Sequence, residues 1–308
     1  MKYVYGPVPS RRLGFSLGVD IVPYKTCTLD CIYCQLGRTT LKTVGRKPYT
    51  QGDIVCREIQ EALHNNQPVD YITFSGSGEP TLNAEIGALI RSVKTITAIP
   101  IVVLTNGTLL FREDVRKDLS AADVVMPSLD AASGALFRKI NRPHPVLNSA
   151  AIIRGLQRFR QEYTGRIWLE VMLIKNLNDD VSELSEIRKA ISDIHPDKVY
   201  LNTVVRPPSE KYAKPLNRNE MLFVKRMLDQ QCEVIAEFRG HKIGETKDVG
   251  EAIVEMSKRR PVTITDIANV LGISTVNAEK WVSGLQESGK LQERQHKGET
   301  YYLCSAEA

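Results

Sequence analysis

Three of the six cysteines, Cys27, Cys31 and Cys34, lie within eight residues in the spacing C-x3-C-x2-C. Thiolates are soft, charged ligands that suit iron–sulfur clusters and zinc. Three thiolates from one short loop can bind three corners of a cubic iron–sulfur cluster and leave its fourth iron open to a small molecule. A structural zinc site needs four protein ligands and would require a distant fourth, for instance Cys56. The spacing favours the cluster over zinc or inert thiols.

The cysteine loop belongs to a chain in which apolar strands alternate with amphipathic helices. The predicted strands are residues 18–21, 71–75, 101–106, 123–130, 166–173 and 198–203. The predicted helices are residues 53–64, 84–94, 112–119, 132–140, 147–163, 181–194 and 216–230. Strands that are apolar throughout are typical of a parallel sheet covered by helices. We therefore expect an α/β fold in which the first strand leads directly into the cysteine loop.

Polar side chains gather where these strands end, which is the face on which α/β barrels build their sites. The strand at 71–75 runs into the turn Gly76-Ser77-Gly78-Glu79, whose glycines let the backbone approach a ligand closely. Later strands end with Thr105, Asn106, Ser128, Asp130, Glu170 and Asn202. As alternatives, the turn is an ordinary βα loop, and Asp130 or Ser133 caps the helix that starts near residue 132.

The cysteine motif, with Tyr33 directly before its third cysteine, resembles the radical S-adenosylmethionine (SAM) superfamily. The resemblance implies that Cys27, Cys31 and Cys34 hold a 4Fe–4S cluster whose free iron is chelated by SAM. One electron then cleaves SAM to methionine and a 5′-deoxyadenosyl radical, which abstracts hydrogen from the substrate. The resemblance also implies a partial (β/α)6 TIM-like barrel and an electron donor such as flavodoxin or ferredoxin.

The same resemblance assigns cofactor contacts to the strand ends. In the family a Gly-Gly-Glu turn after the second strand receives the amino group of SAM, and the matching turn here is Gly76-Ser77-Gly78-Glu79. The family takes further SAM contacts from later strand ends, which match Thr105, Asn106, Ser128 and Asp130. Tyr33, within the cluster loop, completes this cofactor-binding set. No residue is assigned to catalysis on the substrate.

A narrower resemblance connects the chain with the group related to wyosine synthase, which rebuilds a methylated guanine beside the tRNA anticodon. It rests on residues 6–37, 76–81, 128–130, 140–143 and 202–208. Wyosine synthases have additional N-terminal cysteines for a second cluster, whereas no cysteine precedes Cys27 in this chain. The narrower resemblance therefore points to RNA as a substrate without implying the wyosine reaction itself.

The pattern changes after Gly240. Helices are predicted at 246–258, 263–272 and 274–288, and two strands within 291–303. This order resembles a winged helix, so we expect a barrel domain at 1–240 and a winged helix-turn-helix domain at 246–308. The second domain has eight Lys and Arg against nine Asp and Glu, net −1, which leaves +6 for the rest of the chain. Duplex binding needs a basic footprint, so protein or peptide docking, or a structural role, is favoured there.

The 308 residues, 42% hydrophobic and 25% charged with net charge +5, are ordinary for a globular protein. No apolar run approaches the ~20 residues of a membrane span, and the N-terminus has no signal-peptide pattern. We therefore expect a cytoplasmic protein, a compartment that suits reduced cysteines. Six cations in loops or helix starts near the strand ends could bind an anionic substrate or form a solvated rim: Arg138, Arg142, His144, Lys175, Arg206 and Lys211. Of the adjacent Arg11 and Arg12, one could face an anion and the other solvent, or both could be solvated.

Three functions follow from these features. The first is a radical SAM enzyme that acts on RNA or another large anionic substrate. The second is a radical SAM enzyme for a peptide or small molecule, with the winged helix as its recognition element. The third is a regulator in which an iron–sulfur cluster senses redox state and the winged helix binds DNA, which the acidic balance of residues 246–308 disfavours.

Overall fold

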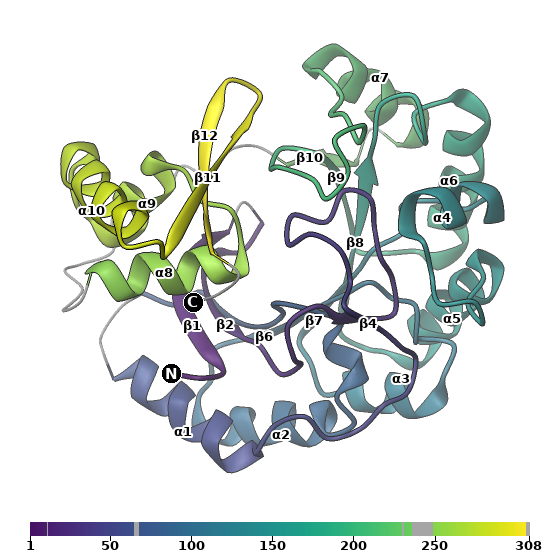
Figure 1. Ribbon diagram of the computed structural model, residues 1–308. Coiled ribbons are helices and arrows are strands. Elements are labelled where there is room, and N and C mark those ends of the chain that lie inside the picture. The colour runs from purple at the N-terminus through teal and green to yellow at the C-terminus, as the bar shows by residue number, and fades with distance from the viewer. Residues whose placement is uncertain (11, 65–67, 230, 236–248, 306–308) are drawn as a thin grey trace.

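An eight-stranded sheet lies at the centre of the protein, in the order β1-β2-β5-β6-β7-β8-β9-β10 (Figure 1). The computed structural model describes residues 1–10, 12–64, 68–229, 231–235 and 249–305. The strands are β1 (Val4–Ser10), β2 (Gly14–Val19), β5 (Tyr71–Phe74), β6 (Ile101–Thr105), β7 (Val124–Pro127), β8 (Arg166–Leu173), β9 (Lys198–Thr203) and β10 (Glu233–Val234). From β2 onward neighbouring strands are parallel, and β1 pairs with β2 antiparallel.

Helices cover the outer face of this curved sheet (Figure 1). They are α1 (Gly52–Leu63), α2 (Ile86–Ile96), α3 (Glu113–Leu119), α4 (Gly134–Asn141), α5 (Ser149–Glu162), α6 (Val181–Ile194) and α7 (Arg218–Leu228). Three short elements lie in the connecting loops: β3 (Thr26–Cys27), β4 (Leu41–Lys42) and the 3-10 helix η1 (Pro80–Leu82). The expected α/β fold with a mostly parallel sheet is confirmed, and the strand predicted to end at residue 130 ends earlier, at Pro127.

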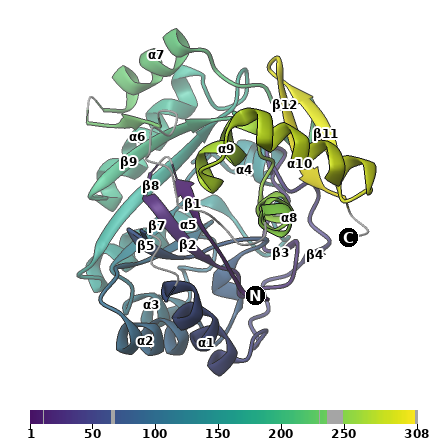
Figure 2. The ribbon, with the colours of Figure 1, turned by 90° about the vertical axis from the view of Figure 1, so that its left-hand side faces the viewer.

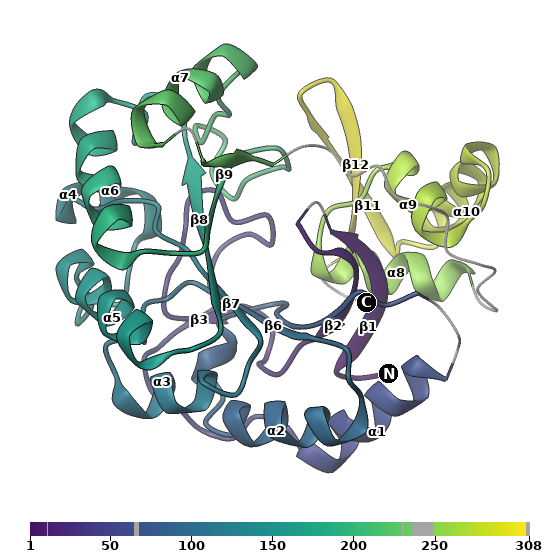
Figure 3. The same cartoon turned by 180° about the vertical axis from the view of Figure 1, so that it is seen from behind.

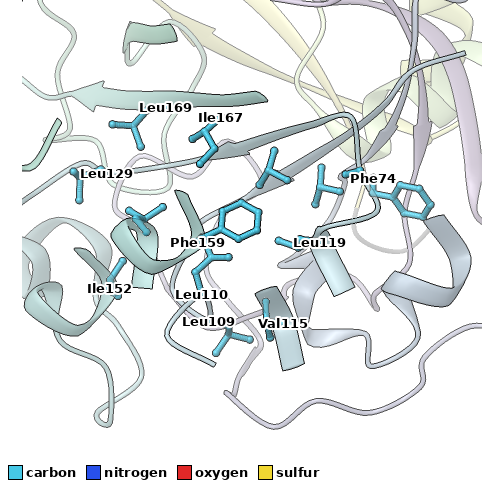
Figure 4. Packing of buried hydrophobic residues seen from close by; sticks show 14 of the residues in the cluster. Phe74, Leu109, Leu110, Val115, Leu119, Leu129, Ile152, Phe159, Ile167 and Leu169 are labelled. Carbon is cyan, nitrogen blue, oxygen red and sulfur yellow. The ribbon is translucent and has the colours of Figure 1, made fainter. Parts of the chain in front are cut away.

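The core fills the space between the sheet and the helices (Figure 4). Phe74 of β5, Phe159 of α5 and Ile167 of β8 are all completely buried within it. The ring of Phe159 stacks on that of Tyr163 with 4.6 Å between centroids. Burying one side chain of this size stabilises a fold by about 1.5–3 kcal/mol. This packing holds the strands in place and therefore fixes the loops at their carboxyl ends.

The N-terminal hairpin differs from the sequence prediction. The first parallel strand spans Gly14–Val19 rather than residues 18–21, and β1 lies beside it with Val4 opposite Val19. Pro7 and Pro9 exclude a helix here, but they do not exclude a strand at the edge of a sheet, where a missing N–H breaks no inner ladder. The edge position of β1 is therefore what makes this strand compatible with its two prolines.

The C-terminal residues form a separate small module with its own core. It consists of α8 (Val249–Arg259), α9 (Ile264–Leu271), α10 (Thr275–Glu287) and the hairpin of β11 (Leu291–His296) and β12 (Glu299–Cys304). Three helices followed by a hairpin is the predicted order, whereas the predicted boundary at residues 240–246 and the start of the first helix lie outside the described residues. Within the described part of the chain, no helix is both long and apolar enough to cross a bilayer.

The C-terminal module contacts both ends of the main sheet. Helix α8 packs on β1, and Phe15 of β2 is buried in the core of the module. At the other end, Nε2 of His296 lies 3.2 Å from the carbonyl oxygen of Val204, and Tyr301 Oη donates to Val205 O at 3.0 Å. Figures 2 and 3 show the module beside β1 and β2 from two directions. The module thus bridges the first strands of the sheet and the loop that follows β9.

Candidate active site

A cavity of about 380 Å³ opens at the carboxyl ends of the parallel strands. Ten of the predicted site residues line it, namely Cys27, Cys31, Tyr33, Cys34, Gly76, Gly78, Glu79, Thr105, Asn106 and Ser128. Ser77 and Asp130 are not among the lining residues of this cavity. The sheet therefore brings together the cysteine loop, the glycine turn and the ends of β6 and β7, although these segments are far apart in sequence.

Each of the three thiols receives one side-chain hydrogen bond. Asn106 Nδ2 donates to Cys27 Sγ at 3.5 Å, and Asn141 Nδ2 donates to Cys31 Sγ at 3.4 Å. Lys25 Nζ donates to Cys34 Sγ at 3.0 Å. Hydrogen bonds to sulfur stabilise the thiolate form and shift the reduction potential of a cluster that the sulfurs ligate. Asn106 follows β6 and Asn141 ends α4, whereas Lys25 belongs to the start of the cysteine loop, so two of the three donors hold the loop from other parts of the chain.

Burial determines the charge of Cys27 and Cys31 when no metal is bound. It raises the pKa of Cys27 to about 12 and that of Cys31 well above its usual value. Burial alone would lower the pKa of Lys25, but the neighbouring Cys34 sulfur and the other two thiols raise it overall. Cys27 and Cys31 therefore hold their protons at neutral pH and release them on binding metal, and charged Lys25 offsets part of the negative charge that results.

The glycine turn fits tightly against the cysteine loop. Lys25 N donates to Ser77 O at 2.8 Å, and Glu79 N donates to Thr26 O at 3.0 Å. A Cβ atom on Gly78 would lie 2.1 Å from the carbonyl oxygen of Thr26, and one on Gly76, at φ +141°, would lie 2.3 Å from the carboxylate carbon of Asp20. Both positions therefore require glycine, since backbone and a buried carboxylate occupy the space that a side chain would need.

Glu79 links the turn to the end of β6. Its Oε1 accepts from Thr105 Oγ1 at 2.6 Å, and from Oγ1 and N of Thr81 at 2.6 and 3.1 Å. Its Oε2 accepts from Asn106 N at 2.7 Å. Burial raises the pKa of Glu79, although these donors favour the charged form. A ligand amino group that bound here would have to share carboxylate oxygens that already accept four hydrogen bonds from the chain itself.

A Glu79→Gln variant is expected to lower the free energy of unfolding by about 1–3 kcal/mol. One buried hydrogen bond is lost, and the new NH2 group is placed against another hydrogen-bond donor. The carboxamide can keep one oxygen for Thr105 or Thr81, but its NH2 group then meets the N–H of Asn106. Urea unfolding followed by circular dichroism measures the change. Glu113→Gln is the matched control, because its partner Lys117 and Glu113 itself are exposed. Equal midpoints for Glu79→Gln and the wild type would contradict this role.

Asp130 lies outside the cavity lining and stabilises the site through hydrogen bonds. It is 4% exposed and accepts from Tyr33 Oη at 2.5 Å, from Asn141 Nδ2 at 2.7 Å and from Met172 N at 3.1 Å. Burial raises the pKa of Asp130, and these three donors act in the opposite direction. Asp130 therefore positions Asn141, which donates to Cys31. The capping alternative holds for Ser133, whose side chain accepts from Leu136 N at the start of α4.

Most of the predicted cations do not line the cavity. Of the six that were expected in loops near the strand ends, only Arg206 lines the cavity. Arg142 pairs with Glu210 at 2.7 Å and Lys175 with Glu220 at 2.6 Å. Arg12 also lines the cavity and forms an ion pair with Glu170, whereas Arg11 lies outside the described residues.

The donor set fits a cluster better than a single ion. Over the residues that the structure describes, no three His, Cys, Asp or Glu side chains are grouped so that they could hold one metal ion. A cubic cluster imposes a different requirement, since each thiolate binds a different iron and the sulfurs need not converge on one point. Three half-buried thiols, each with its own donor, around one cavity meet that requirement.

The family model described as the radical SAM superfamily matches residues 21–187, more than half of the chain. The matched segment contains the three cysteines and the glycine turn. The chain belongs to the radical SAM superfamily. Enzymes of this superfamily use a 4Fe–4S cluster together with SAM, and this chain is such a radical SAM enzyme.

Three relatives of this radical SAM enzyme align with 70 to 98% of its chain. A protein named UPF0026 protein MJ1312, from Methanocaldococcus jannaschii, is 32% identical over 98% of this chain and 96% of its own length. A protein named GTPase Obg, from Brachyspira hyodysenteriae, is 40% identical over 95% of this chain, which spans only 44% of that protein. Another, named probable dual-specificity RNA methyltransferase RlmN, from Thermotoga petrophila, is 23% identical over 70% of this chain and 62% of its own length.

A solved structure of TYW1 with a lysine–pyruvate adduct bound has a similar fold. Its TM-score is 0.55 at 19% identity, and the alignment covers 74% of this chain and 76% of that chain. This radical SAM enzyme and TYW1 therefore share a fold although their sequences are only 19% identical.

Several residues of the site were not found from the sequence. Lys25 lies two residues before Cys27, and its position next to the motif was the available signal. Asn141 lies in a segment that was noted only for its family resemblance. Met256 and Arg260 line the cavity from the C-terminal module, and no local pattern connects them with the cysteines.

Proposed function

We propose that this enzyme uses a 4Fe–4S cluster, held by Cys27, Cys31 and Cys34, to cleave SAM reductively, and that the resulting 5′-deoxyadenosyl radical abstracts hydrogen from a substrate. The bound cluster supplies the electron and an open coordination site for SAM. The chain binds and orients both groups, and the packing around the cavity limits the access of water. The observation that carries this proposal is the set of three half-buried, hydrogen-bonded thiols that line one cavity with the glycine turn.

We assign SAM contacts to the strand ends. The backbone of Gly76 and Gly78 can approach the methionine part closely, and Ser77, Thr105, Asn106 and Ser128 offer polar contacts for its amino and carboxylate groups and the ribose. Glu79 and Asp130 hold this surface in place through their hydrogen bonds. Tyr33, fixed on Asp130, forms part of the wall beside Cys31 and Cys34.

RNA is the substrate class we propose first. Its support is the +6 charge of the chain outside residues 246–308, together with the RlmN relative at 23% identity.

We further propose that residues 1–240 and 246–308 are two domains and that the second is a winged helix with a recognition role. Flavodoxin or ferredoxin is the proposed electron donor. A peptide or small-molecule substrate is the second candidate, and it is favoured by the size of the cavity, about 380 Å³, and by Met256 of the module in its wall.

Anaerobic reconstitution with iron and sulfide, followed by dithionite and SAM, tests the proposal. We expect the wild-type protein to form 5′-deoxyadenosine, detected by chromatography, and we expect added bulk tRNA to raise the amount formed. A reconstituted protein that forms no 5′-deoxyadenosine would overturn the radical reaction. Formation that is unaffected by RNA would remove the RNA substrate and leave the second candidate.

A further inference from the structure

Asn141 is a buried side chain beside the cysteines that has no contact role in the proposed function. It ends α4, is 3% exposed and does not line the cavity of the three thiols. Its Nδ2 donates to Cys31 Sγ at 3.4 Å and to Asp130 Oδ2 at 2.7 Å. We propose that Asn141 is a positioning residue that raises the reduction potential of the cluster through its hydrogen bond to Cys31. This inference rests on the proposed function, because it requires a cluster bound by that cysteine.

The two partners of the Asn141 amide fix its orientation. An NH2 group has two hydrogens, and each of them has a separate acceptor here. With a cluster bound, Cys31 is a thiolate, so neither it nor a carboxylate could donate to the oxygen of a flipped amide. The oxygen itself, Oδ1, has no hydrogen-bond partner among the atoms that the structure describes. Within the protein, Asn141 therefore acts through its NH2 group.

Asp130 directs one of these hydrogens toward the sulfur. Its carboxylate also accepts from Met172 N of β8 and from Tyr33 Oη of the cysteine loop, so it is itself held from two sides. Because the two hydrogens of a planar amide have a fixed angle between them, the bond to Asp130 leaves the second hydrogen pointing at Cys31. The position of this donor is thus set by the sheet rather than by the loop that it contacts.

The backbone keeps Asn141 beside Cys31 independently of its side chain. Asp30 N donates to Asn141 O at 3.0 Å. Ile32 N donates to Ile140 O at 2.9 Å. The N–H groups on either side of Cys31 thus bind carbonyl oxygens at the end of α4, which a helix leaves without partners of its own. Replacing the side chain of Asn141 keeps both backbone bonds, so it removes the contact with sulfur and leaves the cysteine loop in place.

A donor to a ligating sulfur stabilises the reduced form of a cluster more than the oxidised form. Reduction adds negative charge that is shared by the sulfurs, and the hydrogen bond offsets part of it. The effect is larger in a buried site, because screening by water is weak there. Of the three described donors to the thiols, Lys25 and Asn106 line the cavity, whereas Asn141 does not. Removing Asn141 should therefore change the potential without changing the surface offered to SAM.

A redox titration of the reconstituted protein without SAM tests this role, with the reduced cluster followed by electron paramagnetic resonance. At a fixed potential, the ratio of reduced to oxidised cluster in Asn141→Ala should be about tenfold lower than in the wild type. For a one-electron couple this corresponds to a midpoint about 59 mV more negative. Asn141→Leu also lacks a donor but fills more of the space. It should shift the midpoint in the same direction, and it is the second variant if Asn141→Ala does not take up iron.

Asn83→Ala is the matched control. Asn83 is completely buried and does not line the cavity, and its Nδ2 donates to Ile21 O at 2.9 Å and to Thr50 Oγ1 at 3.1 Å rather than to a sulfur. Its replacement should lower the urea midpoint of unfolding and leave the reduction potential unchanged.

The inference is overturned if the Asn141 variants keep the wild-type reduction potential or make it less negative, or if Asn83→Ala shifts it as far as they do. These results would leave the proposed function intact, since the cluster is present in each of them. The predicted shift in a protein that never forms 5′-deoxyadenosine would refute only the proposed radical reaction. A wild-type protein that takes up no cluster would overturn the proposed function and this inference together.

Discussion

A Cys31→Ala variant is expected to lose its iron–sulfur centre and to form no 5′-deoxyadenosine. Cys31 lies between two other cysteines of one loop, and its sulfur is fixed by Asn141. Two thiolates and a methyl group cannot hold three corners of a cubic cluster, so the iron is lost and the reductive cleavage with it. Iron and sulfide content per chain, the visible absorption of the reconstituted protein, and chromatography for 5′-deoxyadenosine measure the three consequences.

Cys56→Ala is the matched control for this variant. Cys56 lies in α1, apart from the cavity, and its removal should leave iron content and 5′-deoxyadenosine formation unchanged. The assignment fails if Cys31→Ala binds as much iron as the wild type. It also fails if the purified protein contains zinc that is lost on replacing Cys56, since that residue was the alternative fourth ligand.

A Gly78→Ala variant is expected to destabilise the protein by about 1–3 kcal/mol or more and to reduce cluster incorporation. The new Cβ would lie 2.1 Å from Thr26 O and 3.0 Å from Val22 Cγ2. Thr26 directly precedes Cys27, and its carbonyl oxygen accepts from Glu79 N, so relief of the clash must move either the cysteine loop or the turn. Urea unfolding before reconstitution measures stability, and iron content after reconstitution measures the effect on the loop.

Gly284→Ala provides the contrasting substitution. Gly284 lies in α10 with no atom within 4 Å of the position that a Cβ would occupy. Alanine is the better helix former there, so stability should rise by about 0.5–1 kcal/mol. If Gly78→Ala were as stable as this variant and bound the same amount of iron, the close approach of turn and loop would have no structural importance.

The sequence predicted the parallel core well because its signals are local. Each inner strand is a short apolar run, and each helix has an apolar face, so Tyr71–Phe74 and Ile101–Thr105 were identified with small errors at their ends. The cysteine spacing is equally local. The edge strand Val4–Ser10 was missed because its two prolines are unfavourable in most strands, and only the unpaired edge of the finished sheet accepts them.

The parts of the site that were missed depend on tertiary packing. Lys25 reaches Cys34 from a left-handed backbone conformation, φ 55°, which its residue type does not favour. Asp130 was expected to contact SAM, and the packing adds a role that the sequence did not indicate, since its carboxylate is buried against Tyr33, Asn141 and Met172 from three different parts of the chain. Arg260 reaches the cavity only because α8 packs on β1, more than 200 residues earlier in the chain.

The burial of Phe15 limits how this enzyme could have acquired its C-terminal module. This ring belongs to a strand of the main sheet, but it is 8% exposed and packs among Ile253, Met256 and Val262. A different module joined to the same sheet would have to provide a new apolar partner for that ring, or leave it in contact with water. Exchange of the module between related enzymes should therefore require coordinated changes in β2, and the two regions should be inherited together.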